Sequence, residues 1–300
     1  MYKETKKKVE IESLNSVANT ALENDCYEKA IQLYKKILQI DPDYEDAIWG
    51  LAEAHFGNSE EAEALVWYKK YLIKFPGDPE ASHMVASLGG GPKPIRASKA
   101  YVRSLFDNFA EDFDRQLLDD LNYDVPRIVY NLFVELGLKA KKVFDILDVG
   151  CGTGLSGVNF VPHAKTLTGV DLSCKMLENA KARGIYDELV EDDLVEFLKT
   201  RPNSFDLIVA SDVFCYFGDL GEVTEAAYFS LRPKGFLIFS VETQSRRGFS
   251  LTTSGRYTHK IAYISKITKK VGLEEITGRE EHLRIEYGKP VKGYVTALKK

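Results

Sequence analysis

At residues 148–154 the chain reads Asp-Val-Gly-Cys-Gly-Thr-Gly, directly at the end of a β-rich run that spans residues 143–149. Glycines let the backbone turn tightly and approach a ligand without an intervening side chain, and an acid beside them can bind an ammonium group or order a water. Gly152, Gly154 and Gly157 also fit the G-x-G-x-x-G pattern of dinucleotide-binding turns. A glycine-rich turn alone is a weak signal, so its meaning depends on the segments that follow.

Short β-rich runs alternate with helical stretches from Lys142 onward. Strands are predicted at residues 143–149, 166–170, 188–190, 205–210 and 236–241. Such alternation is typical of a mostly parallel sheet with helices on both faces. The runs 273–287 and 291–298, joined by Gly-Lys-Pro, predict a closing hairpin with an antiparallel strand. We therefore expect an α/β fold with a Rossmann-like, seven-stranded sheet.

Acids stand where the second, third and fourth predicted strands end. Asp171 ends the second strand, where a carboxylate can accept hydrogen bonds from both hydroxyls of a ribose. Residues 192–194, Asp-Asp-Leu, follow the third strand and can meet an adenine ring, and residues 211–213, Ser-Asp-Val, lie near the switch point where open sheets bind ligands. A single acid here is more often a helix cap, but the ordered series indicates a nucleoside site.

The first ninety residues repeat with an offset of 34, which is the tetratricopeptide period. The offset pairs small residues, an aromatic and the proline that ends the second helix: Ala18 with Ala52, Ala30 with Ala64, Tyr34 with Tyr68, and Pro42 with Pro76. We expect two repeats and a capping helix over residues 10–88, a linker over 89–100 and the second domain over 101–300. The repeats either grip a protein partner in a groove or serve as a helical extension, and both possibilities stay open.

Residues 101–300 resemble the class I S-adenosylmethionine-dependent methyltransferases. Residues 148–154 are similar to the first motif of that family, 171–176 to the second, and 231–235, Leu-Arg-Pro-Lys-Gly, to the turn before the fifth strand. The whole chain is similar to methyltransferases of bacteria that carry tetratricopeptide repeats, through residues 105–107, 240–242 and 255–259.

The resemblance implies S-adenosylmethionine as the methyl donor and S-adenosylhomocysteine as the product. Asp148 and the backbone of Gly150 would hold the methionine amino group, Asp171 the ribose, and Asp193 with Leu194 the adenine. The expected cofactor-binding residues are Asp148, Gly150, Cys151, Gly152, Gly154, Asp171, Leu172, Met176, Asp192, Asp193, Leu194 and Ser211. No metal ligands are expected.

The loop over residues 242–259 is expected to hold the catalytic residues Arg256, Tyr257 and His259, because it follows the fifth strand and would overhang the methyl group. Arg256 could clamp a carboxylate or phosphate of the acceptor. His259 could act as a general base, since imidazole titrates near neutral pH, or it could simply flank the next helix. Phe109, in the apolar helical stripe before the first strand, is a candidate lid over the cofactor.

Composition limits the classes of partner. A formal charge of -5 disfavours general nucleic-acid binding, which needs clustered cations. No run approaches the roughly 20 apolar residues of a membrane helix, so we expect a cytoplasmic protein without a membrane partner. The 4 cysteines form no C-x-x-C pair, which argues against a disulfide framework or a zinc site.

The sequence therefore predicts an enzyme of class EC 2.1.1 that methylates an unidentified acceptor, with the repeats recruiting a protein partner or substrate. The alternative is a repeat scaffold in which the methyltransferase fold senses a ligand or is inactive. A nicotinamide-dependent dehydrogenase ranks last, because one sheet uses up the residues that a substrate domain would need.

Overall fold

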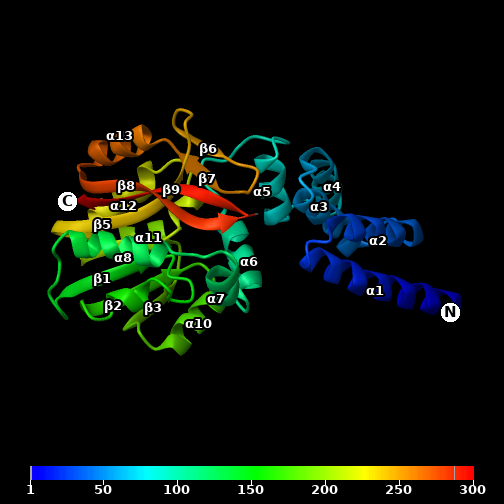
Figure 1. Cartoon of the computed structure of the whole chain (residues 1–300), viewed down its shortest axis with the longest axis horizontal. Helices are drawn as coiled ribbons and strands as arrows, with labels where there is room; N and C mark the ends of the chain where they lie inside the picture. The colour runs from blue at the N-terminus through cyan, green and yellow to red at the C-terminus, as the bar shows by residue number, and fades with distance from the viewer. Residues whose placement is uncertain (1, 287) are drawn as a thin grey trace. The chain divides into compact units, whose positions relative to one another are not determined.

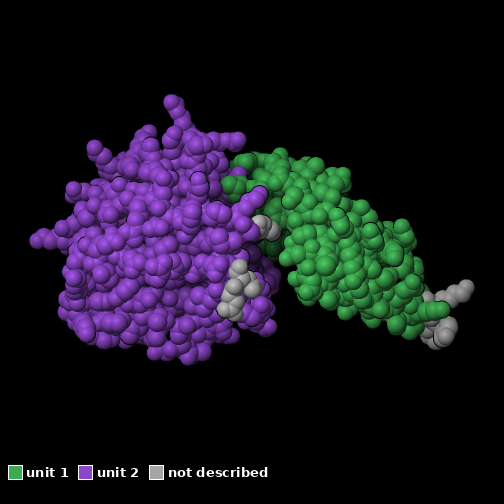
Figure 2. All heavy atoms as spheres, in the orientation of Figure 1, with its two compact units in different colours: residues 1–93, 252–255 green, residues 94–251, 256–300 purple. Residues whose placement is uncertain are grey.

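The computed structural model describes residues 2–286 and 288–300. The chain divides into two compact units (Figure 2). The first contains the chain up to Lys93 together with residues 252–255, and the second contains residues 94–251 and 256–300. The first unit thus ends inside the segment 89–100 that the sequence marks as a linker. Tyr287, which falls in the predicted closing hairpin, lies outside the described residues.

The first unit is built from consecutive helices that pack against their neighbours in the chain. They are α1 (Tyr2–Glu23), α2 (Tyr27–Ile40), α3 (Glu45–Gly57), α4 (Glu61–Lys74) and α5 (Pro79–Ser87). The repeated alanines are fully buried where the helices cross, and the repeated Tyr34 and Tyr68 fill the space beside them. Tyr34 lies so close to Gly50 that a Cβ there would come within 2.3 Å of its Cζ. The small and aromatic positions of the repeat therefore have the packing roles that the period predicts.

The second unit is organised around one mixed sheet. Its parallel strands lie in the order β3 (Glu188–Glu191), β2 (Ala164–Asp171), β1 (Phe144–Val149), β4 (Phe205–Ala210) and β5 (Leu231–Thr243). β9 (Lys289–Lys299) pairs antiparallel with β5 and with β8 (Glu274–Glu286), as Figure 1 shows. The predicted α/β class, the five parallel strands and the antiparallel hairpin are confirmed.

Two short strands were not expected from the sequence. β6 (Phe249–Leu251) and β7 (Tyr257–His259) pair with each other, and β7 continues the sheet beside the end of β5. Across the described residues the sheet has nine strands instead of seven. Three-residue strands are too short to show an alternating pattern, so the segment reads as a loop in the sequence.

Apolar side chains cover both faces of the sheet. On one face, helices α8 (Val125–Glu135) and α9 (Gly157–Phe160) pack on residues such as Ile146, Leu207 and Ile238. The alternate residues of the same strands, such as Leu147 and Ile208, are also fully buried. Strands buried on both faces carry continuous apolar runs, which is why they stand out in the sequence.

The remaining helices of the second unit lie either before β1 in the chain or after one of the later strands (Figure 1). They are α6 (Lys99–Phe109), α7 (Phe113–Arg115), α10 (Cys174–Arg183), α11 (Leu194–Lys199), α12 (Gly221–Ser230) and α13 (Ile261–Val271), with a π-helical turn η1 (Gln116–Asp120) and a 3₁₀ turn η2 (Phe214–Tyr216). Over the residues that the structure describes, none of the helices combines the length and the apolar character that a membrane span requires.

Candidate functional site

A cavity of about 310 Å³ opens at the carboxyl ends of the parallel strands. Each of the first four strands contributes residues from its end or from the segment directly after it: Gly150, Gly152, Val170, Asp171, Leu172, Asp192, Leu194, Ser211, Asp212 and Val213. This is the edge at which open α/β sheets bind their ligands. The volume of the cavity lies at the lower end of the range for small-molecule sites.

The glycine turn after β1 brings bare backbone to the cavity. Gly150 and Gly152 have φ angles of +63° and +53°, which glycine adopts without strain. A Cβ on Gly150 would also lie 2.5 Å from Cγ2 of Val213. A side chain at this position would therefore meet both a strained backbone and an occupied space, so the turn requires glycine.

Asp171 fixes the turn while facing the cavity. Its Oδ2 accepts a hydrogen bond from the Gly152 N–H at 2.8 Å, and its Oδ1 accepts one from the Ser173 N–H at 2.9 Å. Each carboxylate oxygen can accept more than one hydrogen bond, so both keep capacity for ligand hydroxyls. Burial raises the pKa of Asp171 against the opposing effect of these backbone donors. The residue therefore orders the turn and keeps hydrogen-bond acceptor capacity at the cavity.

Asp148, which the resemblance implies would hold the methionine amino group, does not line the cavity. Its side chain is buried, and its Oδ2 accepts a hydrogen bond from the Tyr186 hydroxyl at 2.7 Å. Burial, assisted by the charge of Asp171, raises the pKa of Asp148 to about 7. Cys151, Gly154 and Met176 are likewise buried outside the cavity lining.

The two consecutive acids after β3 have different surroundings. Asp193 caps α11 by accepting the Glu196 N–H at 3.3 Å, and its carboxylate pairs with Arg96 and, at 3.6 Å, with Lys99. Asp192 and Leu194 line the cavity, whereas Asp193 does not. Asp192 therefore faces the cavity, whereas Asp193 serves as a helix cap and ion-pair partner.

An apolar wall faces the strand ends. It consists of side chains from α6, α7 and the segment after them: Val102, Leu105, Phe106, Phe109, Phe113, Leu117 and Leu121. Side-chain bonds tie this segment to the sheet side of the cavity, among them Ser173 Oγ to Asp107 Oδ1 at 2.5 Å and Asn179 Nδ2 to the Ala110 carbonyl at 2.8 Å. Phe109, the candidate lid, lies in this wall.

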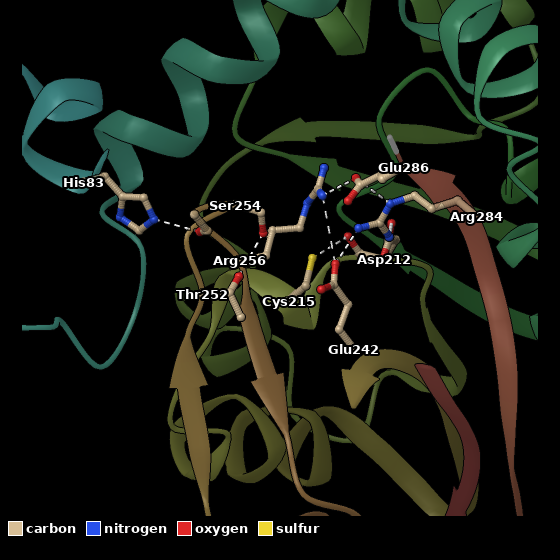
Figure 3. A network of polar contacts seen from close by, with 10 residues as sticks. His83, Asp212, Cys215, Glu242, Thr252, Ser254, Arg256, Arg284 and Glu286 are labelled. Carbon is tan, nitrogen blue, oxygen red and sulfur yellow. Dashed lines mark hydrogen bonds and ion pairs between the residues drawn. The ribbon is translucent and has the colours of Figure 1, made fainter. Parts of the chain in front are cut away.

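Five charged side chains form a further group at the site, which we call the arginine–carboxylate cluster (Figure 3). Arg284, on β8, contacts Asp212 Oδ2 at 2.7 Å, Glu286 Oε1 at 2.9 Å and Glu242. Arg256 pairs with Glu286 and lies 4.0 Å from Glu242 Oε1. Asp212, Arg256 and Arg284 all line the cavity. Sequence reasoning missed Arg284, because nothing in a single sequence links β8 to the end of β4.

His259 and Tyr257 do not line the cavity. Tyr257 is fully buried and its hydroxyl donates to the Pro94 carbonyl at 2.8 Å. His259 is also fully buried, and its Nε2 lies 3.0 Å from the Gly218 carbonyl, so this nitrogen carries the proton. Burial lowers the pKa of His259 to about 4. We therefore propose a structural role for this imidazole in place of the general-base role expected from the sequence.

The low pKa of His259 predicts a pH effect on stability. An unfolded histidine takes up a proton near pH 6.5, whereas His259 stays neutral in the folded protein until about pH 4. The unfolded state therefore binds more protons between these values, and stability should fall with decreasing pH by up to about 1.4 kcal/mol per pH unit. In His259→Gln, which keeps a donor for Gly218, this component should be absent. Urea unfolding of both proteins at pH 7, 6 and 5 measures it, and parallel curves would contradict the structural role.

Comparisons with known proteins agree with this geometry. Residues 147–239 match the family described as methyltransferase domain, and residues 21–88 match the family described as tetratricopeptide repeat. The malonyl-[acyl-carrier protein] O-methyltransferase of Acetivibrio thermocellus is 29% identical over 208 residues, which are 60% of this chain and 73% of that protein. The ubiquinone biosynthesis O-methyltransferase of Klebsiella pneumoniae is 24% identical over 161 residues, which are 49% of this chain and 65% of that protein.

Two solved structures share the fold. The 1,6-didemethyltoxoflavin-N1-methyltransferase of Burkholderia thailandensis, with bound 1,6-didemethyltoxoflavin and S-adenosylhomocysteine, has a TM-score of 0.53 and 16% identity over 69% of this chain and 92% of its own. The magnesium protoporphyrin IX methyltransferase of Synechocystis PCC 6803, with bound S-adenosylhomocysteine, has a TM-score of 0.51 and 18% identity over 67% and 99%.

Fold, cavity and family matches together define the second unit as a class I methyltransferase domain. The second unit thus contains a methyltransferase domain with the fold of S-adenosylmethionine-dependent methyltransferases, and the first unit contains tetratricopeptide repeats.

Proposed function

We propose that the chain belongs to class EC 2.1.1 and transfers the methyl group of S-adenosylmethionine to an oxygen atom of a small acceptor bound against the apolar wall. One observation carries this proposal: a single cavity joins the strand-end residues of a nucleoside site to a wall of aromatic side chains. Both curated relatives described above are named O-methyltransferases, which supports oxygen as the accepting atom.

The residues that line the cavity fit the methyl donor. The glycine turn at Gly150 and Gly152 leaves room for its amino acid portion, Asp171 has free acceptor capacity for the ribose hydroxyls, and Asp192 can take the adenine amino group. Leu172, Leu194 and Ser211 complete this side of the cavity. S-adenosylmethionine supplies a methyl group activated by its sulfonium, so the chain has to align the acceptor and exclude water.

The repeats of the first unit extend the proposal to a partner. Tetratricopeptide repeats build extended surfaces from stacked helix pairs, and such surfaces commonly bind proteins. We propose that the first unit recruits a protein partner or a protein-bound substrate, and that the reaction takes place in the cytoplasm.

Binding of the donor is the direct test. S-adenosylmethionine and S-adenosylhomocysteine should each raise the melting temperature, because a ligand that binds only the folded state stabilises it by about 2.7 kcal/mol at 100 times its Kd. Calorimetry and a thermal melt on the full chain measure this, with NAD as the control ligand. Heat and stabilisation from NAD alone, or from none of the three, would refute the proposed function and favour a scaffold protein.

A further inference from the structure

We propose that the acceptor is an apolar aromatic molecule with a neutral phenolic hydroxyl, and that Asp212 is the catalytic residue that receives the hydroxyl proton. The inference rests on the proposed function and specifies the substrate class of the same cavity. Three features of the described residues carry it: the position of Asp212, the charge around it and the nature of the facing wall.

Asp212 is held in one orientation with one oxygen left over. It follows β4 with a φ of +61°, a left-handed conformation that is uncommon outside glycine, and its N–H donates to Ser240 Oγ at 2.8 Å. Oδ2 pairs with Arg284 at 2.7 Å. Oδ1 is buried and has no hydrogen-bond partner among the described residues, although Asp212 lines the cavity. A buried oxygen that accepts no hydrogen bond destabilises the fold. The hydroxyl of a bound methyl acceptor would supply the missing hydrogen bond.

The charge of the site disfavours an anionic acceptor. Each arginine that lines the cavity is already paired: Arg96 with Asp193, Arg256 with Glu286, and Arg284 with three carboxylates. Asp171, Asp192 and Asp212 add negative charge to the lining, which suits a cationic donor. Among the described lining residues, no guanidinium is left to clamp an acceptor carboxylate, the role expected for Arg256 from the sequence.

Of the three carboxylates in the arginine–carboxylate cluster, Asp212 lines the cavity, whereas Glu242 and Glu286 do not. Burial raises the pKa of Glu242 against the opposing effect of both arginines, while those arginines outweigh burial and lower the pKa of Glu286. Burial, followed by the charge of Asp212, raises the pKa of Tyr123 well above its usual value. The Cys215 thiol, whose pKa burial also raises, donates to the Asp212 carbonyl at 3.2 Å. Tyr123 and Cys215 therefore stay protonated around Asp212.

The facing wall selects an aromatic body. Phe106, Phe109 and Phe113 already pack edge to face with centroid separations of 6.2 Å and 5.4 Å, an arrangement that extends favourably to a further ring. A phenolic hydroxyl also gives up its proton near pH 10, far more readily than an aliphatic alcohol, so a carboxylate can assist its removal.

The step balances as follows. The proton of the acceptor O–H bond passes to Asp212 Oδ1, and the oxygen lone pair forms the new bond to the methyl carbon. The bond between that carbon and sulfur breaks with its electron pair on sulfur, which turns the sulfonium into a neutral thioether. Asp212 then releases the proton to water.

The test compares matched probes and matched variants. The probes are 4-butylphenol and 4-butylbenzoate, which share the apolar body and differ in the reacting group. Calorimetry on the S-adenosylhomocysteine complex should show that the phenol binds at least about tenfold more tightly than the benzoate. Labelled S-adenosylmethionine should methylate the phenol oxygen.

The variant Asp212→Asn suits the left-handed backbone at this position, because asparagine also adopts that conformation readily. Asp206→Asn, an arginine-paired aspartate on the opposite end of β4, is the control.

Asp212→Asn should lower turnover by about 10²-fold or more while binding S-adenosylhomocysteine like the parent chain, and its turnover should recover with rising pH as the phenol ionises. Asp206→Asn should keep parental turnover. Tighter or equal binding of the benzoate, no methylation of the phenol, or parental turnover in Asp212→Asn would overturn the inference. The binding comparison uses the unaltered chain, so it decides the acceptor class even if the variant does not fold. If the unaltered chain bound neither S-adenosylmethionine nor S-adenosylhomocysteine, the proposed function itself would be refuted.

Discussion

Replacing Arg284 by methionine should lower the free energy of unfolding of the second unit by about 3–5 kcal/mol. The guanidinium is 2% exposed and contacts Asp212, Glu242 and Glu286. Methionine fills most of the same space, so the loss comes from the charge: the carboxylates stay buried while the cation between them is gone. Removing one partner of a buried ion pair is far more destabilising than its net contribution to the intact pair suggests.

The pH dependence of this loss has a defined sign. Although burial opposes them, Arg256 and Arg284 lower the pKa of Glu286 in the folded protein. Glu286 therefore contributes stability above its unfolded pKa, and the contribution disappears as the pH falls through its folded value. Without Arg284 much of that contribution is absent at neutral pH already. The difference between the parent chain and Arg284→Met should therefore shrink as the pH falls below about 4.5 and through the lowered pKa of Glu286.

Arg232→Met is the matched control. Arg232 also lies between two carboxylates, Asp145 at 2.7 Å and Asp206 at 2.8 Å, but its side chain is 37% exposed. Solvent can replace its interactions, so the loss should stay near 1 kcal/mol or below. Urea unfolding at several pH values measures both variants. If both variants lost the same free energy of unfolding, burial would not determine how much the arginine–carboxylate cluster contributes to stability.

Asp171→Ala should weaken binding of S-adenosylhomocysteine by about 10-fold to 150-fold, the equivalent of about 1.5–3 kcal/mol for hydrogen bonds to a charged group. Two effects add. The ribose loses its acceptor, and the Gly152 N–H loses the oxygen that orders the turn. Calorimetry at fixed pH measures the affinity.

Asp187→Ala separates ligand binding from support of the backbone. Asp187 Oδ2 accepts the Leu167 N–H at 2.8 Å in the same unit, but the residue does not line the cavity. This variant should lose stability and keep its affinity for S-adenosylhomocysteine. Parental affinity in Asp171→Ala would show that the carboxylate only orders the turn.

The sheet could be predicted because each central strand is buried on both faces and carries an apolar run. The edge of the sheet at which the cavity opens could be predicted as well, since strand ends of a parallel sheet meet at one edge and Asp171 and Ser211 stand at such ends. Which way a side chain points at those ends could not be predicted. Asp148 and Asp193 also stand near strand ends, yet their carboxylates contact Tyr186 and Arg96.

The acceptor side was harder to predict for a different reason. His259 and Arg256 are three residues apart in the sequence, but only Arg256 reaches the cavity, because the unexpected strand β7 buries His259 beside Gly218. Arg284 and Asp212 meet through pairing of β8 with β9 and of β9 with β5, which no local pattern reveals.

The placement of Arg284 on β8 also orders events during synthesis. The ribosome releases Asp212 and Glu242 well before Arg284, and β8 reaches β5 only through β9, the last strand of this chain. Until the hairpin of β8 and β9 pairs with β5, Arg284 is absent from the arginine–carboxylate cluster, and this part of the cavity lining is incomplete. The repeats, which depend on contacts between neighbouring helices, can fold while the remainder is still being made. The repeats can therefore be in place before the arginine–carboxylate cluster is complete.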